Sequence, residues 1–84
     1  MTTRFYYVYL IRSIKFPAQT YVGFTEDLEQ RIIDHNRGAS VHTAPFSPWR
    51  LVSAHAFTDE AKAKAFERYL KRGSGRAFAK RHLW

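Results

Sequence analysis

FYYVYLI, at residues 5–11, is a run of aromatic and β-branched side chains, and it predicts a β-strand. Side chains alternate across a strand, so this run presents two different faces. The even-numbered residues are expected on one face and the odd-numbered ones on the other: Tyr6, Val8 and Leu10 against Tyr7, Tyr9 and Ile11. A second short strand is expected at residues 20–23, after a loop that contains Pro17. This separation suits an antiparallel hairpin with a longer loop than the minimum.

The rest of the chain predicts three helices and one more strand. A helix is expected from residue 25 to about 37, capped by Thr25 and stopped by Gly38. A proline-containing loop over 39–49 then leads to a strand over 50–57. A helix from about 59 to 72, capped by Thr58, is followed by a short helix over 76–83. Its Phe78 is expected to pack inward, and the preceding helix is expected to bury Phe66, Tyr69 and Leu70. The order β-β-α-β-α-α predicts an α+β fold, a small three-stranded antiparallel sheet flanked by helices.

Length and composition restrict the possible classes of protein. Residues 1–84 are expected to form a single domain, and 45% of them are hydrophobic and 17% aromatic, which favours a packed core over disorder. The chain contains no cysteine, so a disulfide scaffold, a thiolate zinc site and cysteine catalysis are excluded. No apolar run approaches the ~20 residues that span a bilayer. A cytoplasmic location without a membrane partner is therefore expected.

The positive charge is concentrated at one end of the sequence. The net charge is +7, yet residues 1–61 hold six basic and six acidic residues and are neutral. Residues 62–84 hold eight basic residues and one acid, Glu67. Such a one-sided excess predicts a polyanion partner, nucleic acid before anionic membrane, although a merely solvated surface has the same composition. The expected nucleic-acid-binding residues are Lys64, Arg68, Lys71, Arg72 and Arg76.

Several side chains suit phosphodiester hydrolysis, which needs an activated water and neutralisation of charge on phosphorus. If the first two strands pair as a hairpin, Tyr9 and Tyr21 emerge on the same face. Arg31 offers a planar fork of donors for phosphate oxygens, and His35, four residues later, lies on the same side of the helix. Glu67 is a hard carboxylate of the kind that Mg²⁺ or Mn²⁺ prefers. A tyrosine needs help to act as a base at neutral pH, whereas His35 needs less tuning.

The order of these residues resembles the GIY-YIG nuclease superfamily over essentially the whole chain. The two triplets are Tyr7-Val8-Tyr9 and Tyr21-Val22-Gly23, followed by Arg31-x-x-x-His35 and the helical Glu67. The chain looks closest to the short stand-alone bacterial members, which are similar to the N-terminal nuclease domain of excinuclease ABC. The resemblance implies a divalent-metal-dependent endonuclease with a low-specificity DNA substrate, in DNA repair or processing. Its expected catalytic residues are Tyr9, Tyr21, Arg31, His35 and Glu67, with Glu67 as the ligand of Mg²⁺ or Mn²⁺.

Alternatives remain open for each part of this hypothesis. Arg31 and His35 could be a surface pair, and Glu67 could be an ordinary salt-bridge partner of Lys64 or Lys71. The two tyrosines taken singly suit packing. No catalytic role is expected for Thr43, and the spacing of His42, His55 and His82 predicts no metal site. The whole chain could be a non-catalytic nucleic-acid-binding or adaptor module on the same fold. A small domain has little surface for reading bases, which favours a protein partner that supplies specificity.

Overall fold

The computed structural model describes residues 3–84 and has the expected element order. The strands are β1 (Tyr6–Ser13), β2 (Thr20–Thr25) and β3 (Trp49–Phe57). The helices are α1 (Leu28–Asn36), α2 (Glu60–Leu70) and α3 (Gly73–His82), with a 3₁₀ turn, η1, at Ala44–Phe46. Both strand pairs are antiparallel and the sheet order is β2-β1-β3, so the predicted α+β fold is confirmed.

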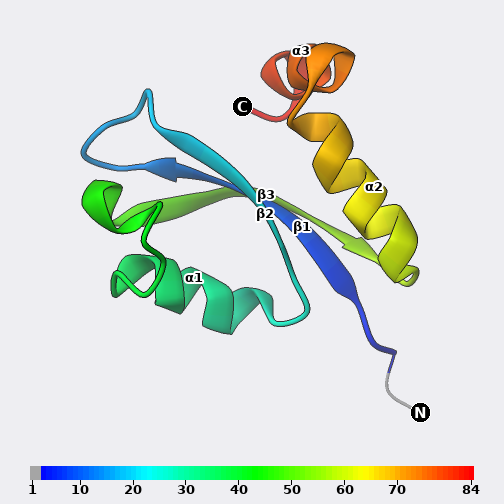
Figure 1. Cartoon of the computed structure of the whole chain (residues 1–84), viewed down its shortest axis with the longest axis horizontal. Coiled ribbons are helices and arrows are strands. Elements are labelled where there is room, and N and C mark those ends of the chain that lie inside the picture. Colours follow the sequence, from blue (N-terminus) through cyan, green and yellow to red (C-terminus); the bar gives the residue numbers. More distant parts are fainter. Residues whose placement is uncertain (1–2) are drawn as a thin grey trace.

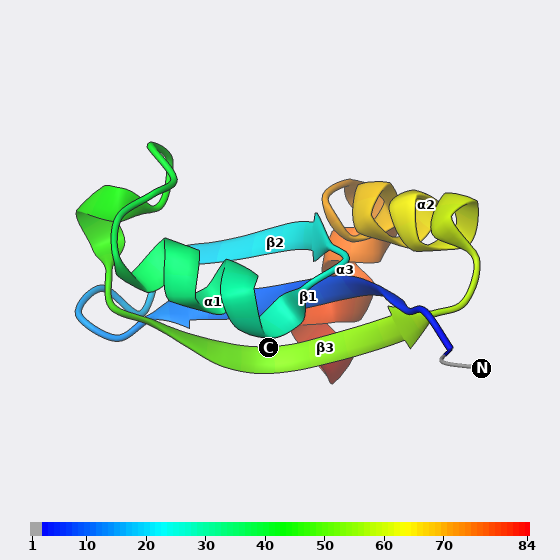
Figure 2. The same cartoon turned by 90° about the horizontal axis from the view of Figure 1, so that it is seen from below.

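The helices cover both faces of the sheet. Figure 1 shows α1 on one side of the strands and α2 and α3 on the other. In the view turned by 90°, α1 lies in front of the sheet and α3 behind it (Figure 2). None of the helices in residues 3–84 has the length and apolar character that crossing a membrane requires. The central strand β1 therefore lies between two layers of helix, while β2 and β3 form the edges of the sheet.

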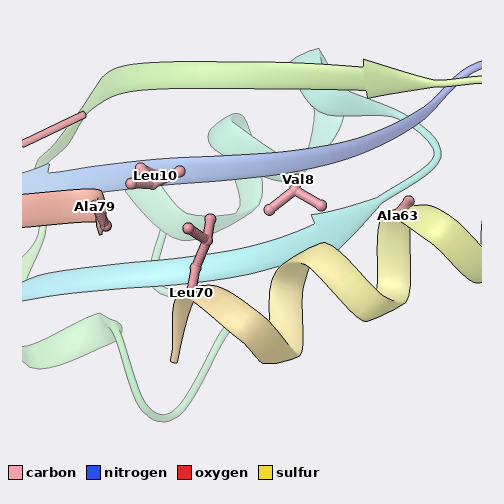
Figure 3. Packing of buried hydrophobic residues seen from close by; sticks show 5 residues of the cluster. All are labelled: Val8, Leu10, Ala63, Leu70 and Ala79. Atoms are coloured by element: carbon pink, nitrogen blue, oxygen red, sulfur yellow. The ribbon is translucent and has the colours of Figure 1, made fainter. Parts of the chain in front are cut away.

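Strand β1 contributes to two separate cores, as its alternation predicts. Val8 and Leu10 are fully buried against α2 and α3, where they meet Ala63, Leu70 and Ala79 (Figure 3). On the opposite face Tyr9 and Ile11 are fully buried with Trp49. The fully buried side chains of the first core are all aliphatic, whereas those of the second include the phenol of Tyr9.

The predicted helix caps were each wrong in position. Pairing with Tyr7 extends β2 as far as Thr25, so the cap of α1 is Asp27, whose carboxylate accepts from the amide of Gln30 at 3.1 Å. Likewise Asp59 caps α2 by accepting from the amide of Lys62 at 3.2 Å. In both cases an aspartate at the turn out of a strand provides the side-chain acceptor that the helix start needs.

The two C-terminal helices also differ from the prediction. Helix α3 begins at Gly73, three residues earlier than predicted, because Gly73 adopts a φ of +40° and turns the chain directly after α2. Gly75 lies so near the end of α2 that a Cβ there would come within 1.6 Å of the carbonyl oxygen of Tyr69. The rings of Tyr69 and Phe78 contact each other with centroids 6.1 Å apart but lie on the surface, 43% and 38% exposed, so their predicted burial was wrong.

Candidate active site

Gly23 makes room for the ring of Tyr9. The two residues face each other across β1 and β2, and a Cβ on Gly23 would lie 2.3 Å from both Cζ and the hydroxyl oxygen of Tyr9. The ring therefore lies across β2 where any larger residue would block it. Tyr21 lies two residues earlier on the same face, with its ring centroid 6.3 Å from that of Tyr9. The hairpin thus brings both tyrosines to the α1 side of the sheet, as predicted.

A buried chain of hydrogen bonds joins Tyr9 to the loop before β3. The hydroxyl of Tyr9 lies 2.7 Å from Nε2 of His35, and Nδ1 of His35 lies 2.7 Å from Oγ1 of Thr43. All three side chains are at most 1% exposed. The loop is held in turn because the indole N–H of Trp49 donates to the carbonyl oxygen of Thr43 at 2.9 Å. A buried polar chain of this kind is stable only when each member has a partner.

The roles of the two ring nitrogens of His35 depend on its tautomer. Arg31 acts on the Tyr9 phenol, and a guanidinium can only donate. In one tautomer the O–H of Tyr9 donates to Nε2 of His35, and Nδ1 carries the proton and donates to Thr43. In the other, Nε2 donates to the phenol oxygen and Nδ1 accepts from the hydroxyl of Thr43. Both tautomers give every member of the chain a partner.

Burial and charge act on these groups in opposite directions. The pKa of Tyr9 is raised to about 12: burial is the largest cause, Arg31 opposes it in part, and the nearby charges of Tyr21 and Glu67 add to it. Burial alone would lower the pKa of Arg31, but Tyr9, Tyr21 and Asp34 outweigh it and raise that pKa. Arg31 is thus held positive beside two phenols and a carboxylate.

His35 is held neutral. Burial lowers its pKa, the positive charge of Arg31 lowers it further, and Asp34 opposes both. A neutral imidazole inside the protein can accept a proton, whereas a protonated one cannot. Low exposure and the cation beside it therefore leave His35 available as an acceptor at neutral pH.

The groups that face outward lie around this chain. Tyr21, Arg31 and Glu67 are partly exposed, whereas Tyr9 and His35 are not. Glu67 lies on α2, and Oε2 of its carboxylate pairs with Nζ of Lys71 at 2.9 Å. The same ammonium lies 5.7 Å from the centroid of the Tyr21 ring. Lys71 therefore connects the carboxylate on α2 to the tyrosine on the edge strand.

Glu67 is the residue best suited to hold a metal ion. In the part of the chain described, no three His, Cys, Asp or Glu side chains form a cluster that could hold one. A carboxylate that keeps most of the water shell of the ion is an ordinary Mg²⁺ arrangement. The pairing of Lys71 with Oε2 leaves Oε1 of Glu67 for such an ion, so the residues present fit a hydrated Mg²⁺ or Mn²⁺.

The structure brings the five predicted catalytic residues to one edge of the sheet. Tyr9, Tyr21, Arg31 and His35 lie between β1, β2 and α1, and Glu67 approaches from α2. The salt bridge considered as an alternative role for Glu67 exists, and its partner is Lys71, while Lys64 pairs with Glu60 at 3.3 Å.

The predicted nucleic-acid-binding residues separate into two groups. Arg68 and Arg72 are exposed on the surface and Lys64 is taken up by Glu60, whereas Lys71 and Arg76 line a pocket. Sequence reasoning missed Lys80 and Trp84, which line the same pocket, and gave no role to Thr43. A buried threonine in a proline-containing loop has no local pattern that marks it, because its partner lies eight residues away on a helix.

Comparison with known proteins agrees with this geometry. Residues 5–81 match the GIY-YIG catalytic domain. The chain belongs to the GIY-YIG family. Within it, the chain is 35% identical over 72 residues to a UPF0213 protein of Lacticaseibacillus paracasei, covering 84% of this chain and 79% of that one. The solution NMR structure of a UPF0213 protein from Bacillus halodurans superimposes with a TM-score of 0.55 at 30% identity, covering 90% of this chain and 80% of that one.

Longer eukaryotic proteins share the same region. The structure-specific endonuclease subunit SLX1 of Candida dubliniensis is 34% identical over 86 residues, which is 94% of this chain but 29% of that protein. The SLX1 homologue of Drosophila mojavensis is 38% identical over 72 residues, 75% of this chain and 24% of that protein. The chain therefore spans under a third of the length of these SLX1 relatives.

Proposed function

We propose that this GIY-YIG domain is a divalent-metal-dependent endonuclease that hydrolyses phosphodiester bonds in nucleic acid. The observation that carries the proposal is the buried chain Tyr9–His35–Thr43, which ends beneath Arg31 and Tyr21. Packing alone does not require an imidazole or hydroxyl groups in a core, because buried polar groups stabilise little unless they are fully paired. Hydrolysis requires groups that hold or accept a proton close to the reacting atoms.

Each residue has a role that its position allows. Arg31, positive and partly exposed, binds a phosphate oxygen of the bond to be cleaved and stabilises the charge that develops on it. Tyr21, also partly exposed, orients the attacking water. Tyr9 is fully buried, so it does not meet the water; its hydroxyl, held by Nε2 of His35, keeps Arg31 in place. A Mg²⁺ or Mn²⁺ ion at Glu67 would neutralise phosphate charge and make bound water more acidic.

The substrate preference extends the proposal to DNA with low sequence specificity, in repair or processing. SLX1 relatives are named structure-specific endonuclease subunits, which supports a substrate recognised by shape and a protein partner that contributes to it. In the chain itself, the charge of residues 62–84 supports nucleic acid as the ligand.

A second candidate is a non-catalytic nucleic-acid-binding module on the same fold. The Glu67–Lys71 ion pair supports this second candidate, because a carboxylate whose only role is to stabilise α2 would form the same contact. The two candidates differ in what happens when the carboxylate is neutralised.

The deciding experiment is a cleavage assay on branched, duplex and single-stranded DNA and RNA, with Mg²⁺, with Mn²⁺ and with EDTA. Glu67→Gln removes the charge but keeps helix propensity, and Glu60→Gln is the matched control because it breaks an equivalent ion pair, to Lys64, on the same helix. We expect metal-dependent cleavage by the wild type and by Glu60→Gln, and none by Glu67→Gln, which still binds substrate. Equal turnover by both variants, or no cleavage of any substrate by the wild type, would support the non-catalytic module.

A further inference from the structure

A pocket opens beside the candidate active site, on the far side of Tyr21. It has a volume of about 570 Å³ and lies between the edge strand β2, the end of α2 and helix α3. That volume is within the range of ~300–1,000 Å³ typical of small-ligand sites. Tyr21 and Lys71 belong both to this pocket and to the candidate active site. A chain-like ligand that occupies one would therefore continue into the other.

The lining combines positive charge with aromatic surface. Lys71, Arg76 and Lys80 contribute three cations, and none of the residues that line the pocket is acidic. Lys71 is engaged by Glu67, whereas no ion pair or side-chain hydrogen bond within residues 3–84 engages Arg76 or Lys80. Trp84 completes the wall and is partly exposed. Cations for phosphate and an aromatic ring for a base are the combination that binds single-stranded nucleic acid.

Trp84 is held in place from behind. Its amide donates to the carbonyl oxygen of Ala79 at 2.9 Å, and the guanidinium of Arg12 lies 5.5 Å from the centroid of its ring. Nε of Arg12 is buried and has no hydrogen-bond partner in the described part of the chain. A fixed aromatic ring is a better stacking surface than a mobile one, because less freedom is lost on binding.

We propose that this pocket binds one unpaired nucleotide of the substrate strand, next to the phosphodiester bond that is cleaved. Arg76 and Lys80 hold its phosphate, and its base stacks on Trp84. A base inside a duplex cannot enter such a pocket without leaving its partner, which disfavours uninterrupted duplex. The proposal rests on the proposed nuclease function and assigns to it a substrate class: strands with an unpaired nucleotide at the cleavage point, as at single-stranded or branched sites.

The test measures binding separately from cleavage. A short fluorescein-labelled oligothymidylate is titrated with protein in EDTA and followed by fluorescence anisotropy, with an unlabelled blunt duplex as competitor. Trp84→Leu keeps an apolar side chain, though a smaller one, and removes the stacking surface, while Trp84→Phe keeps a ring. Arg76→Glu/Lys80→Glu reverses two pocket charges, and Lys62→Glu/Arg81→Glu reverses two charges on the same pair of helices outside the pocket. Circular dichroism and thermal unfolding establish that each variant is folded.

We expect Trp84→Leu to weaken single-strand binding about tenfold, with Trp84→Phe close to wild type and duplex competition unchanged. The pocket charge reversal should weaken single-strand binding at least tenfold more than the control reversal. Single-strand binding by Trp84→Leu that equals wild type, or equal losses for the two charge reversals, would overturn the pocket. If that happens while Glu67→Gln still abolishes cleavage, the nuclease proposal stands without it. If the wild type cleaves nothing but single-strand binding depends on Trp84, the pocket stands and the nuclease proposal falls.

Discussion

The two faces of the sheet use the same strand for different purposes. On the α2 and α3 face, β1 buries Val8 and Leu10 in an aliphatic cluster. On the α1 face, one residue away in sequence, it buries Tyr9 against His35, which bonds in turn to Thr43. Apolar burial stabilises in proportion to area, whereas a polar chain contributes little net stability and demands complete pairing. The first face therefore stabilises through apolar burial alone, whereas the second combines apolar burial with the polar chain of the candidate active site.

The largest expected effect is the loss of stability on substitution of Leu10, compared with substitution of its neighbour Tyr9 on the other face of β1. Leu10→Ala should lower the free energy of unfolding by about 2–5 kcal/mol, because it leaves a cavity in the aliphatic core. Tyr9→Phe keeps the ring and should cost less stability but more cleavage activity. Urea denaturation and cleavage per folded molecule measure the two effects. Equal stability losses in both variants would contradict the division between the faces.

Gly23→Ala should disturb the chemical face alone. A Cβ would collide with the Tyr9 ring, so the ring must shift, and stability should fall by about 1–3 kcal/mol. A displaced catalytic group should reduce cleavage on the order of 100-fold. The same change made in Tyr9→Ala should cost much less stability, because the ring that it meets is gone. Additive losses in this double-mutant cycle would show that Gly23 matters for another reason.

Thr43→Val tests whether the far end of the polar chain matters. Valine has a similar shape but leaves Nδ1 of His35 without its partner, at a cost on the order of 1–2 kcal/mol. Cleavage should fall as well, since the imidazole of His35 is no longer held by a hydrogen bond on both sides. Thr43→Ser keeps the hydroxyl and serves as the control in thermal unfolding and cleavage assays. Loss of activity in Thr43→Ser equal to that in Thr43→Val would point to packing in place of the hydrogen bond.

The smallest effect is expected in the pH dependence of stability. Burial lowers the pKa of both His35 and His55 in the folded protein, while the unfolded chain keeps the ordinary value of about 6.5. Below pH ~6.5 the unfolded state therefore binds protons that the folded state does not, and stability falls as the pH falls. Each histidine contributes a slope of at most about 1.4 kcal/mol per pH unit. His35→Gln and His55→Gln should each flatten the curve between pH 7 and 5 in urea denaturation; an unchanged slope in either would contradict the assignment.

The sequence predicts what depends on local pattern. Alternation along residues 5–11 places both cores correctly, and the order of elements follows from turn residues and apolar spacing. Both N-caps were predicted one or two residues too early, because the extent of a strand depends on its register with the neighbouring strand, which the sequence does not show. The hydrogen bond of Thr43 and the contact of Trp84 with Arg12 were not predicted, because each joins residues that are separated in sequence and close in the fold.

The close approach at Gly75 fixes how α3 is seated on the end of α2. Because no side chain stands between Gly75 and the carbonyl of Tyr69, α3 rests directly on the end of α2. Any larger residue there would move α3, which carries Arg76 and Lys80. Helix α3 holds none of the five proposed catalytic residues, so position 75 acts on the proposed nucleotide pocket from outside the proposed catalytic set. A library built at position 75 would vary how α3 is seated on α2, and with it the width of the pocket.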